Sequence, residues 1–352
     1  MTRLQRTRDR ITGIRGEIGA GSQRLLDQKT KPRRSLGRLE DLACQIAAIR
    51  GIPVPPLPRK AVVVMAADHG VAEEGVSAYP AEVTGQMLLN FARGGAAINV
   101  LARRAGAEVV VVDMGVKNPV SASEGIRSQR LGPGTANFTR GPAMSRETAT
   151  RAVEVGIELA EELIGGGITL LGIGDMGIAN TTASSALAAA YTGASPHDVT
   201  GRGTGIDDET YSRKIAVVRR GLALHPPNPQ DPLDTLARLG GFEIAGLAGV
   251  VLGSAATKVP VVLDGFITSV AALVAVRLAP PAAGYLIASH RSVEKGHGVV
   301  LEAIGAKPLL DLDLRLGEGT GSALALGLVD AALAVLQEMA TFESAGVTDS
   351  GA

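Results

Sequence analysis

The residues with the clearest chemical potential in this 352-residue chain lie in three glycine-rich loops. The first loop, 172–177 (GIGDMG), follows the apolar run ITLL and has the Gly-x-Gly-x-x-Gly spacing, which lets backbone N–H groups approach a phosphate at a helix start. A dinucleotide fold needs a second strand ending in an acid about 20 residues later, but Asp198 follows YTGASPH, which is no strand. We interpret the loop as a phosphate or ribose site; the alternative is a tight turn that needs small residues.

The second loop, 200–205 (TGRGTG), precedes a predicted helix that carries Lys214. Glycines and hydroxyl groups form anion-binding nests, and a lysine one or two turns into the following helix adds a positive charge. The loop therefore predicts a further contact with a phosphate. The alternative, a flexible surface loop with a solvated lysine, fits this stretch equally well.

The third loop, 316–322 (LGEGTGS), places Glu318 between two glycines directly before the last predicted helix. Glycines on both sides of a carboxylate indicate close approach of a ligand, so we interpret Glu318 as a general base. The alternative is that Glu318 caps the helix, whose N-terminus favours a negative group.

Motifs for metal binding and for nucleophilic catalysis are not found. The five histidines have no metal-ligand spacing, and His290 and His297 lie in SHRSVEKGH without an HExxH pattern. Asp311 and Asp313 alternate in DLDL and have the chemistry to hold Mg²⁺, although solvated strand residues are the better interpretation. The single cysteine, Cys44, excludes a disulfide framework, a Cys-based zinc site and an iron–sulfur cluster. No Gly-x-Ser-x-Gly nucleophile elbow occurs.

The composition excludes several classes of protein. Lysine and arginine number 35, as do aspartate and glutamate, so the zero net charge disfavours a nucleic-acid binder with a basic surface. Hydrophobic residues make up 45% of the chain, which excludes a disordered protein. The most apolar region, 244–279, is interrupted by Lys258, Pro260 and Asp264, so we expect no membrane segment. The N-terminus lacks the apolar core of a signal peptide, and we expect a cytoplasmic protein.

Short β-branched runs that end in Gly- or Asp-containing turns alternate with helical stretches. The runs are 61–70, 107–115, 168–177, 259–265 and 282–290, and the helical stretches include 80–105, 145–164, 181–191, 207–222 and 267–278. Continuous apolar runs indicate strands buried on both faces, so we predict an α/β fold with a doubly wound, mostly parallel sheet and helices on both faces. Ligands bind such sheets beyond the carboxyl ends of the strands. Polar residues there are the functional candidates.

We expect two domains. The proline-rich stretch 51–60 (GIPVPPLPRK) indicates a stiff linker after helical residues 1–50. We predict a large α/β substrate-binding domain over 60–310 and a small helical domain made of 1–59 with 311–352, which contributes the Glu318 loop. The last predicted helix, 321–342, is apolar on nearly all sides, which places it in the core or in a subunit interface and favours a homodimer.

Nine sequence blocks together carry a resemblance to a known family. They are KPRRSLGRLEDLA, AADHGVAEEGVSAYPAEVTGQM, GGAAINVLA, VVDMGV, GTANFTRGPAM, GIGDMGIANTTASSA, TGRGTGID, VVLDGFITS and LGEGTGSAL. Over about residues 31–347 the sequence resembles the nicotinate-nucleotide–dimethylbenzimidazole phosphoribosyltransferases, which make the lower-ligand nucleotide of cobalamin. The resemblance implies that nicotinate mononucleotide gives its phosphoribosyl group to 5,6-dimethylbenzimidazole, yielding α-ribazole 5′-phosphate and nicotinate. Direct displacement inverts C1′, and neither a metal nor another cofactor is expected, because no pyrophosphate leaves.

The resemblance also implies roles for individual residues. Glu318 is the expected general base, because it stands where the family's Gly-Glu-Gly-Thr-Gly block has its glutamate. The expected phosphate and ribose contacts are Gly174, Asp175, Met176, Gly177, Asn180, Thr181, Gly203, Lys214 and Ser292. The expected benzimidazole pocket comprises Tyr79, Gln86, Met87 and Leu316. The chain departs from the family at Asp175, where glutamate is frequent, and in KPRRSLG, where the family commonly reads KPxGSLG.

Three other functions compete with this interpretation. An NAD-dependent oxidoreductase would need the missing second strand and acid. A diphosphate-using phosphoribosyltransferase would need two adjacent acids, where VVVVDMG has one. A non-catalytic nucleotide-binding module would not need a carboxylate such as that of Glu318 between two glycines.

Overall fold

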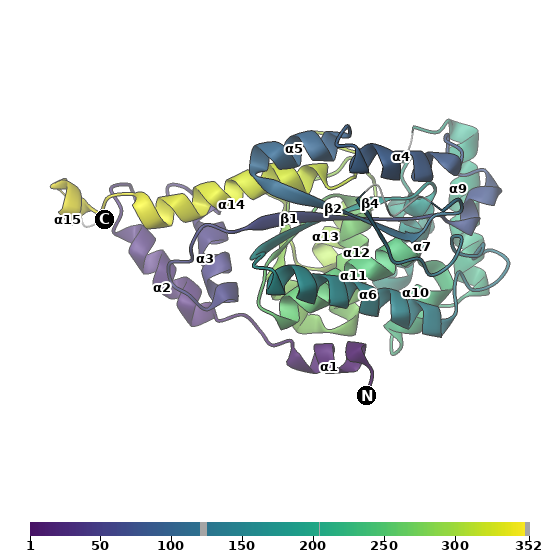
Figure 1. The fold of residues 1–352 in the computed structure, drawn as a ribbon, viewed down its shortest axis with the longest axis horizontal. Helices are drawn as coiled ribbons and strands as arrows, with labels where there is room; N and C mark the ends of the chain where they lie inside the picture. Colours follow the sequence, from purple (N-terminus) through teal and green to yellow (C-terminus); the bar gives the residue numbers. More distant parts are fainter. Residues whose placement is uncertain (120–124, 204, 349–352) are drawn as a thin grey trace.

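The structure is a computed structural model that describes residues 1–119, 125–203 and 205–348. Its centre is a six-stranded parallel sheet in the order β3-β2-β1-β4-β5-β6. Figure 1 labels the central strands β1, β2 and β4. The strands are β1 (Lys60–Ala67), β2 (Ala107–Gly115), β3 (Ile126–Ser128), β4 (Leu170–Met176), β5 (Val261–Leu263) and β6 (Leu286–Ala288). The predicted parallel α/β sheet is confirmed, and each predicted apolar run contains a strand. The sequence does not predict β3, because three residues at a sheet edge carry no clear pattern.

Helices cover both faces of the sheet (Figure 1). Their bounds are α1 (Arg3–Arg10), α2 (Gly16–Asp27), α3 (Arg38–Arg50), α4 (Glu82–Ala92), α5 (Ala97–Ala105), α6 (Arg146–Gly165), α7 (Asn180–Thr192), α8 (Pro196–Val199), α9 (Asp208–Leu224), α10 (Pro232–Leu239), α11 (Phe242–Ala256), α12 (Phe266–Leu278), α13 (His297–Ala303), α14 (Thr320–Glu338) and α15 (Phe342–Ala345). Val63 and Met65 of β1 belong to the core beneath α6, α11 and α12. Val62 and Val64 belong to the core beneath α4, α5 and α14. Because alternate residues are buried on opposite faces, the strand reads as a continuous apolar run.

The observed helices include α8, α10 and α13, which the sequence does not predict, and they differ from the predicted ones in three further places. Residues 80–105 form two helices, α4 and α5, because the chain turns at Gly94, whose φ of 78° is left-handed. The sequence does not reveal α11, which is buried on nearly all sides and so lacks an apolar stripe. α11 packs closely on α6: a Cβ on Gly156 would lie 1.8 Å from the carbonyl oxygen of Gly246. The last long helix, α14, ends at Glu338, and the short α15 follows it.

α14 links the sheet to the terminal helices. It contacts α5 and β4 beside the sheet, and α3 and α2 where it extends away from the sheet (Figure 1). Among the described residues it is the one helix long and apolar enough to cross a membrane, but more than half of it is buried inside the fold, as in a core helix. That the chain has no membrane segment stays a prediction.

The terminal segments pack in two different places. α2 contacts α3, α3 contacts α14, and Lys29 forms an isolated antiparallel bridge with Thr341. α1 instead lies against α6 and α11 beneath the sheet, with Arg3 paired to Glu161 at 2.7 Å. The division into residues 60–310 and residues 1–59 with 311–352 stays a prediction, and the contacts of α1 place it with the sheet layers.

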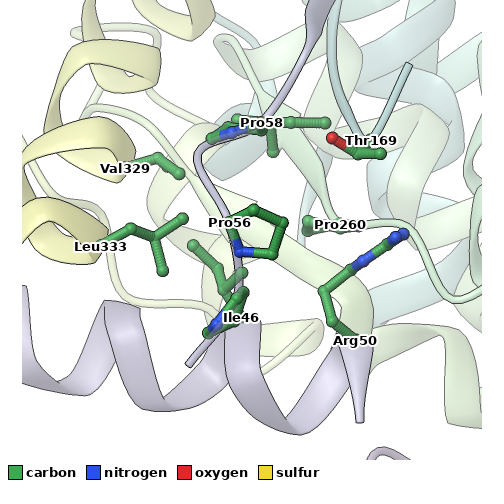
Figure 2. A pocket seen from close by; sticks show the side chains of 10 residues that line it. Ile46, Arg50, Pro56, Pro58, Thr169, Pro260, Val329 and Leu333 are labelled. Carbon is green, nitrogen blue, oxygen red and sulfur yellow. The ribbon is translucent and has the colours of Figure 1, made fainter. Parts of the chain in front are cut away.

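The proline-rich linker packs between α3 and α14 (Figure 2). It borders a cavity of about 30 Å³, room for about one water molecule. The cavity is also bounded by Thr169 and Pro260, which directly precede β4 and β5, so it lies at the amino ends of the strands. Ligand sites of such sheets lie at the opposite ends, so this cavity belongs to the packing of the linker.

Candidate active site

Polar side chains from four strands meet at the carboxyl edge of the sheet. Asp68 and His69 follow β1, Asp175 lies near the end of β4, Asp264 follows β5, and His290 follows β6. All five are buried. No group of three or more His, Cys, Asp or Glu side chains in the described part of the chain is arranged to hold a metal ion. The edge is thus rich in buried carboxylates, each of which needs a compensating partner.

The loop that carries Glu318 has a strained backbone. Gly317, Glu318 and Gly319 have φ angles of 84°, 63° and 92°. A left-handed conformation costs a residue with a side chain about 1–2 kcal/mol, and such strain clusters at functional sites. β4 passes directly beside the loop: a Cβ on Gly174 would lie 2.4 Å from the carbonyl carbon of Glu318. The small size of Gly174 therefore serves the packing of this loop, while its expected phosphate contact stays a prediction.

Asp264 holds the same loop from the other side. Its buried carboxylate accepts hydrogen bonds from the backbone N–H groups of Gly319 at 2.8 Å and Gly321 at 2.7 Å. Burial raises the pKa of Asp264 to about 8, the charge of Asp175 raises it further, and the backbone hydrogen bonds oppose the rise. Asp264 thus binds the first N–H groups of α14. This arrangement disfavours the alternative that Glu318 is the cap of that helix.

The carboxylate of Glu318 is buried but incompletely bonded. It forms a hydrogen bond with the backbone of Ile98, in the first turn of α5. Its Oε2 atom has no hydrogen-bond partner among the described residues. Burial raises the pKa of Glu318, and the bond to Ile98 opposes this only in part. Buried polar atoms are rarely left without a partner, so the free oxygen is positioned to accept a hydrogen bond from a ligand.

Asp175 lies beside this loop. A Cβ on Gly317 would be 3.7 Å from Oδ2 of Asp175, and the same oxygen accepts a hydrogen bond from the Asn180 amide at 2.8 Å. Burial raises the pKa of Asp175 to about 7; the Asn180 bond lowers it, and the charges of Glu243 and Glu318 raise it. The structure therefore brings Asp175 and Asn180 together next to the proposed base.

His69 and Glu243 form a buried pair that the sequence does not reveal. Nε2 of His69 lies 2.7 Å from Oε1 of Glu243. Burial lowers the pKa of His69, but the carboxylates of Glu243, Asp68 and Asp175 outweigh this effect and raise it. The ring packs against Gly241, where a Cβ would lie 2.3 Å from Cε1. The position of His69 after a strand is visible in the sequence, whereas Glu243 lies on the unpredicted α11.

A buried lysine marks the predicted phosphate site. Lys214 is 1% exposed, its Nζ donates to Oγ1 of Thr181 at 2.8 Å, and a Cβ on Gly203 would lie 3.2 Å from Nζ. Within the described ranges it forms no ion pair. Burial lowers its pKa to about 8, and the charge of Glu294 opposes this. A buried ammonium without an ion pair is costly, so this one is suited to an anion. Thr204 of the same loop lies outside the described residues.

The loop after β6 closes the phosphate region. Ser292 is buried in it, and Glu294 faces the second glycine-rich loop, where a Cβ on Gly201 would lie 2.0 Å from Oε2 of Glu294. An open groove of about 520 Å³ adjoins this region. Its lining includes three cationic side chains, Arg202, Lys295 and Arg315. The groove shares Gly203 with the surroundings of Lys214, and cationic side chains beside that loop favour a phosphorylated ligand.

The predicted benzimidazole residues lie around α4 and the Glu318 loop. Gln86 and Met87 lie on α4, Tyr79 precedes that helix, and Leu316 precedes Glu318. Tyr79 and Leu316 are 55% and 58% exposed. Two exposed apolar side chains are available to a ligand, but no contact in the described structure joins the four residues into an enclosed pocket. Their role in binding a base stays a prediction, as do the substrate contacts of Met176 and Gly177.

Comparisons with known proteins agree with one another. The profile of a family described as Phosphoribosyltransferase matches residues 11–347. A nicotinate-nucleotide–dimethylbenzimidazole phosphoribosyltransferase of Chloroflexus aggregans is 57% identical over 349 residues, which are 99% of either chain. The protein of the same name from Geobacter sulfurreducens is 54% identical with the same coverage. The crystal structure of the nicotinate-nucleotide–dimethylbenzimidazole phosphoribosyltransferase from Thermus thermophilus is 49% identical and has a TM-score of 0.89, covering 95% of this chain and 99% of that one.

Proposed function

Because this chain belongs to the nicotinate-nucleotide–dimethylbenzimidazole phosphoribosyltransferase family, we propose that it transfers the phosphoribosyl group of nicotinate mononucleotide to 5,6-dimethylbenzimidazole with inversion at C1′. The products are α-ribazole 5′-phosphate and nicotinate. The chain is a pentosyltransferase by family.

The chemistry requires one proton acceptor. The leaving nitrogen of nicotinate mononucleotide is a pyridinium, so nicotinate departs without acid assistance. When one benzimidazole nitrogen attacks C1′, the proton on the other nitrogen becomes acidic. A carboxylate within hydrogen-bond reach accepts that proton and offsets the positive charge that develops on the base.

The unpartnered Oε2 of Glu318 is the observation that carries this proposal. The oxygen is buried on a loop that is held by Asp264 on one side and packed on Gly174 on the other. A fixed and incompletely bonded carboxylate costs nothing to reorient when the substrate N–H arrives. Attack of the benzimidazole from the Glu318 side, opposite to the departing nicotinate, inverts C1′.

The nucleotide phosphate is proposed to bind at Lys214. The ammonium already has Thr181 as its neighbour and forms no ion pair in the described part of the chain, although the charge of Glu294 acts on it from beyond ion-pair distance. Gly203 and Ser292 are proposed to add a backbone N–H and a hydroxyl, and Asp175 with Asn180 to contact the ribose. The exposed side chains Tyr79, Gln86 and Leu316 and the partly buried Met87 are proposed to hold the benzimidazole.

The displacement is proposed to need no cofactor and no metal, because the leaving group is a neutral pyridine ring nitrogen and no pyrophosphate is released. We further propose a cytoplasmic homodimer whose partners are its two small substrates, without nucleic acid or membrane. The zero net charge supports the absence of a nucleic-acid partner, and the apolar side chains of α14 that the fold leaves partly exposed, Leu328 and Val335, support the homodimer.

Product analysis tests the proposal. The chain is incubated with nicotinate mononucleotide and dimethylbenzimidazole, products are identified by mass, and the anomer is assigned by NMR. We expect equal amounts of nicotinate and the α-linked nucleotide. Nicotinate release without the new nucleotide would indicate a hydrolase, and a β-linked product would exclude direct displacement.

A further inference from the structure

A further buried histidine, His297, lies behind the proposed phosphate site. His297 is the first residue of α13 and is fully buried. It is not among the residues expected to touch substrate. Its ring is nevertheless bonded to the loop that carries Ser292, so it can act through that residue.

The hydrogen bonds determine which nitrogen of His297 carries the proton. The backbone N–H of Ser292 lies 2.9 Å from Nδ1 of His297. A backbone N–H can only donate, so Nδ1 accepts and is unprotonated. The neutral ring must then carry its proton on Nε2, which donates to Oγ of Ser269 at 3.0 Å.

Burial keeps this ring neutral. Burial lowers the pKa of His297 to about 3, and the charges of His290 and Arg291 lower it further. A protonated ring would place an N–H group against the N–H of Ser292, so the observed bond requires the neutral form.

The same turn orients the hydroxyl of Ser292. Oγ of Ser292 accepts a hydrogen bond from the backbone N–H of Glu294 at 3.3 Å, and the backbone N–H of His297 donates to the carbonyl oxygen of Glu294 at 2.9 Å. None of the hydrogen bonds between described residues uses the hydroxyl proton of Ser292. Both ends of the turn are therefore bound to His297, and the hydroxyl proton stays available for a ligand.

We propose that His297 is a positioning residue for the nucleotide: the lone pair on its Nδ1 fixes the turn 292–297, so that the Ser292 hydroxyl donates to the phosphate. The same turn keeps Glu294 against Gly201, beside the loop that contacts Lys214. This inference rests on the proposed function, since it takes Ser292 as a phosphate contact.

Two amide substitutions of His297 distinguish the role of Nδ1 from that of Nε2. In His297→Asn the side-chain oxygen lies where Nδ1 accepts, whereas in His297→Gln the amide nitrogen lies where Nε2 donates. We expect His297→Asn to keep the KM for nicotinate mononucleotide within about threefold, and His297→Gln to raise it about tenfold, the equivalent of one lost hydrogen bond to an anion. The KM for dimethylbenzimidazole and kcat are expected to change less than about threefold in both variants.

His225→Gln is the matched control. His225 is also buried, but its Nε2 contacts the carbonyl oxygens of Phe138 and Gly141, away from the Ser292 turn. We expect this variant to keep those contacts through its amide nitrogen and to leave the KM for nicotinate mononucleotide unchanged. If His297→Gln does not fold, Ser269→Ala replaces it, because this change leaves the Nε2 proton without its acceptor. A KM for nicotinate mononucleotide raised by more than about threefold is then expected, and a KM within about threefold of the wild type would overturn the proposal.

The outcomes distinguish this inference from the proposed function. A wild-type chain that neither binds nor consumes nicotinate mononucleotide overturns both. If the wild type turns over and the Asn and Gln variants have equal KM values, whether normal or raised, the role of Nδ1 is overturned. A rise confined to His297→Gln, which disappears when Ser292→Ala is already present, supports it, because the two residues then act as a unit.

Discussion

Replacing Glu318 with glutamine removes the proposed proton acceptor and keeps the size of the side chain. The amide oxygen can retain the hydrogen bond to Ile98, and the bonds of Asp264 to the loop are untouched. General-base catalysis contributes about 10²–10⁴-fold. We therefore expect turnover to fall at least about 10²-fold, or about 2.7 kcal/mol of barrier. The KM for nicotinate mononucleotide should stay within about threefold, because Lys214 and its neighbours are unchanged.

The structure predicts a different effect on stability. Burial raises the pKa of Glu318, so the folded chain disfavours the ionised carboxylate. The free energy of unfolding therefore begins to fall as pH rises through the ordinary pKa of glutamate, and the loss is complete above the raised pKa of Glu318. Glutamine removes this loss. Glu318→Gln is therefore expected to be at least as stable as the wild type at neutral pH, with an advantage that shrinks on acidification.

Turnover and thermal unfolding are measured together from about pH 5 to 9, a window that contains carboxyl groups with raised pKa values. The wild type is expected to lose turnover as pH falls through the raised pKa of Glu318, and the glutamine variant should lack that limb. Glu318→Asp should retain part of the activity, because the acceptor is present but withdrawn. Near-normal turnover of Glu318→Gln would refute the assignment. A lowered melting temperature with turnover almost intact would instead show a structural role.

Three further changes test other parts of the site and fold. Lys214→Met should raise the KM for nicotinate mononucleotide more than the KM for dimethylbenzimidazole. In the wild type the KM for nicotinate mononucleotide should rise above about pH 8, because the Lys214 ammonium loses its charge there. An equal rise of both KM values in the variant would show that Lys214 does not bind the nucleotide phosphate. Gly174→Ala places a Cβ within 2.4 Å of the Glu318 backbone, so it should lower turnover and should lower the free energy of unfolding by about 1–3 kcal/mol. The control Gly13→Ala has open space around the new Cβ and should change neither turnover nor the free energy of unfolding. Arg34→Gly should raise the free energy of unfolding by up to about 1 kcal/mol, since Arg34 has a φ of 59°; a lower melting temperature would show that the arginine side chain outweighs the backbone strain.

The sequence alone determined the layered α/β architecture. β1, β2 and β4 are buried on both faces over most of their length, so each contains a continuous apolar stretch that is recognisable as a strand from the sequence alone. The position of Glu318 between two glycines is likewise a local pattern. Ligands bind parallel sheets beyond the carboxyl ends of the strands, so the candidate functional residues were expected at that edge of the sheet.

Tertiary structure decided which residues complete the site. Asp264 and Gly319 are 55 residues apart, and His69 and Glu243 are 174 residues apart, so no local spacing connects them. α11, which carries Glu243, shows no apolar stripe because every side of it is buried.

The charge state of Glu318 also depended on the fold. A negative group beside a helix N-terminus suggests a lowered pKa, yet burial raises the pKa of Glu318, and Asp264 binds the first N–H groups of α14. In the same way, the sequence offers Lys214 as a candidate phosphate contact, but only the fold buries its ammonium and so makes an anion a favourable partner for it. Local sequence patterns show which ionisable groups are present. Their pKa values depend on burial and on neighbouring groups, which come from segments that meet only in the folded chain.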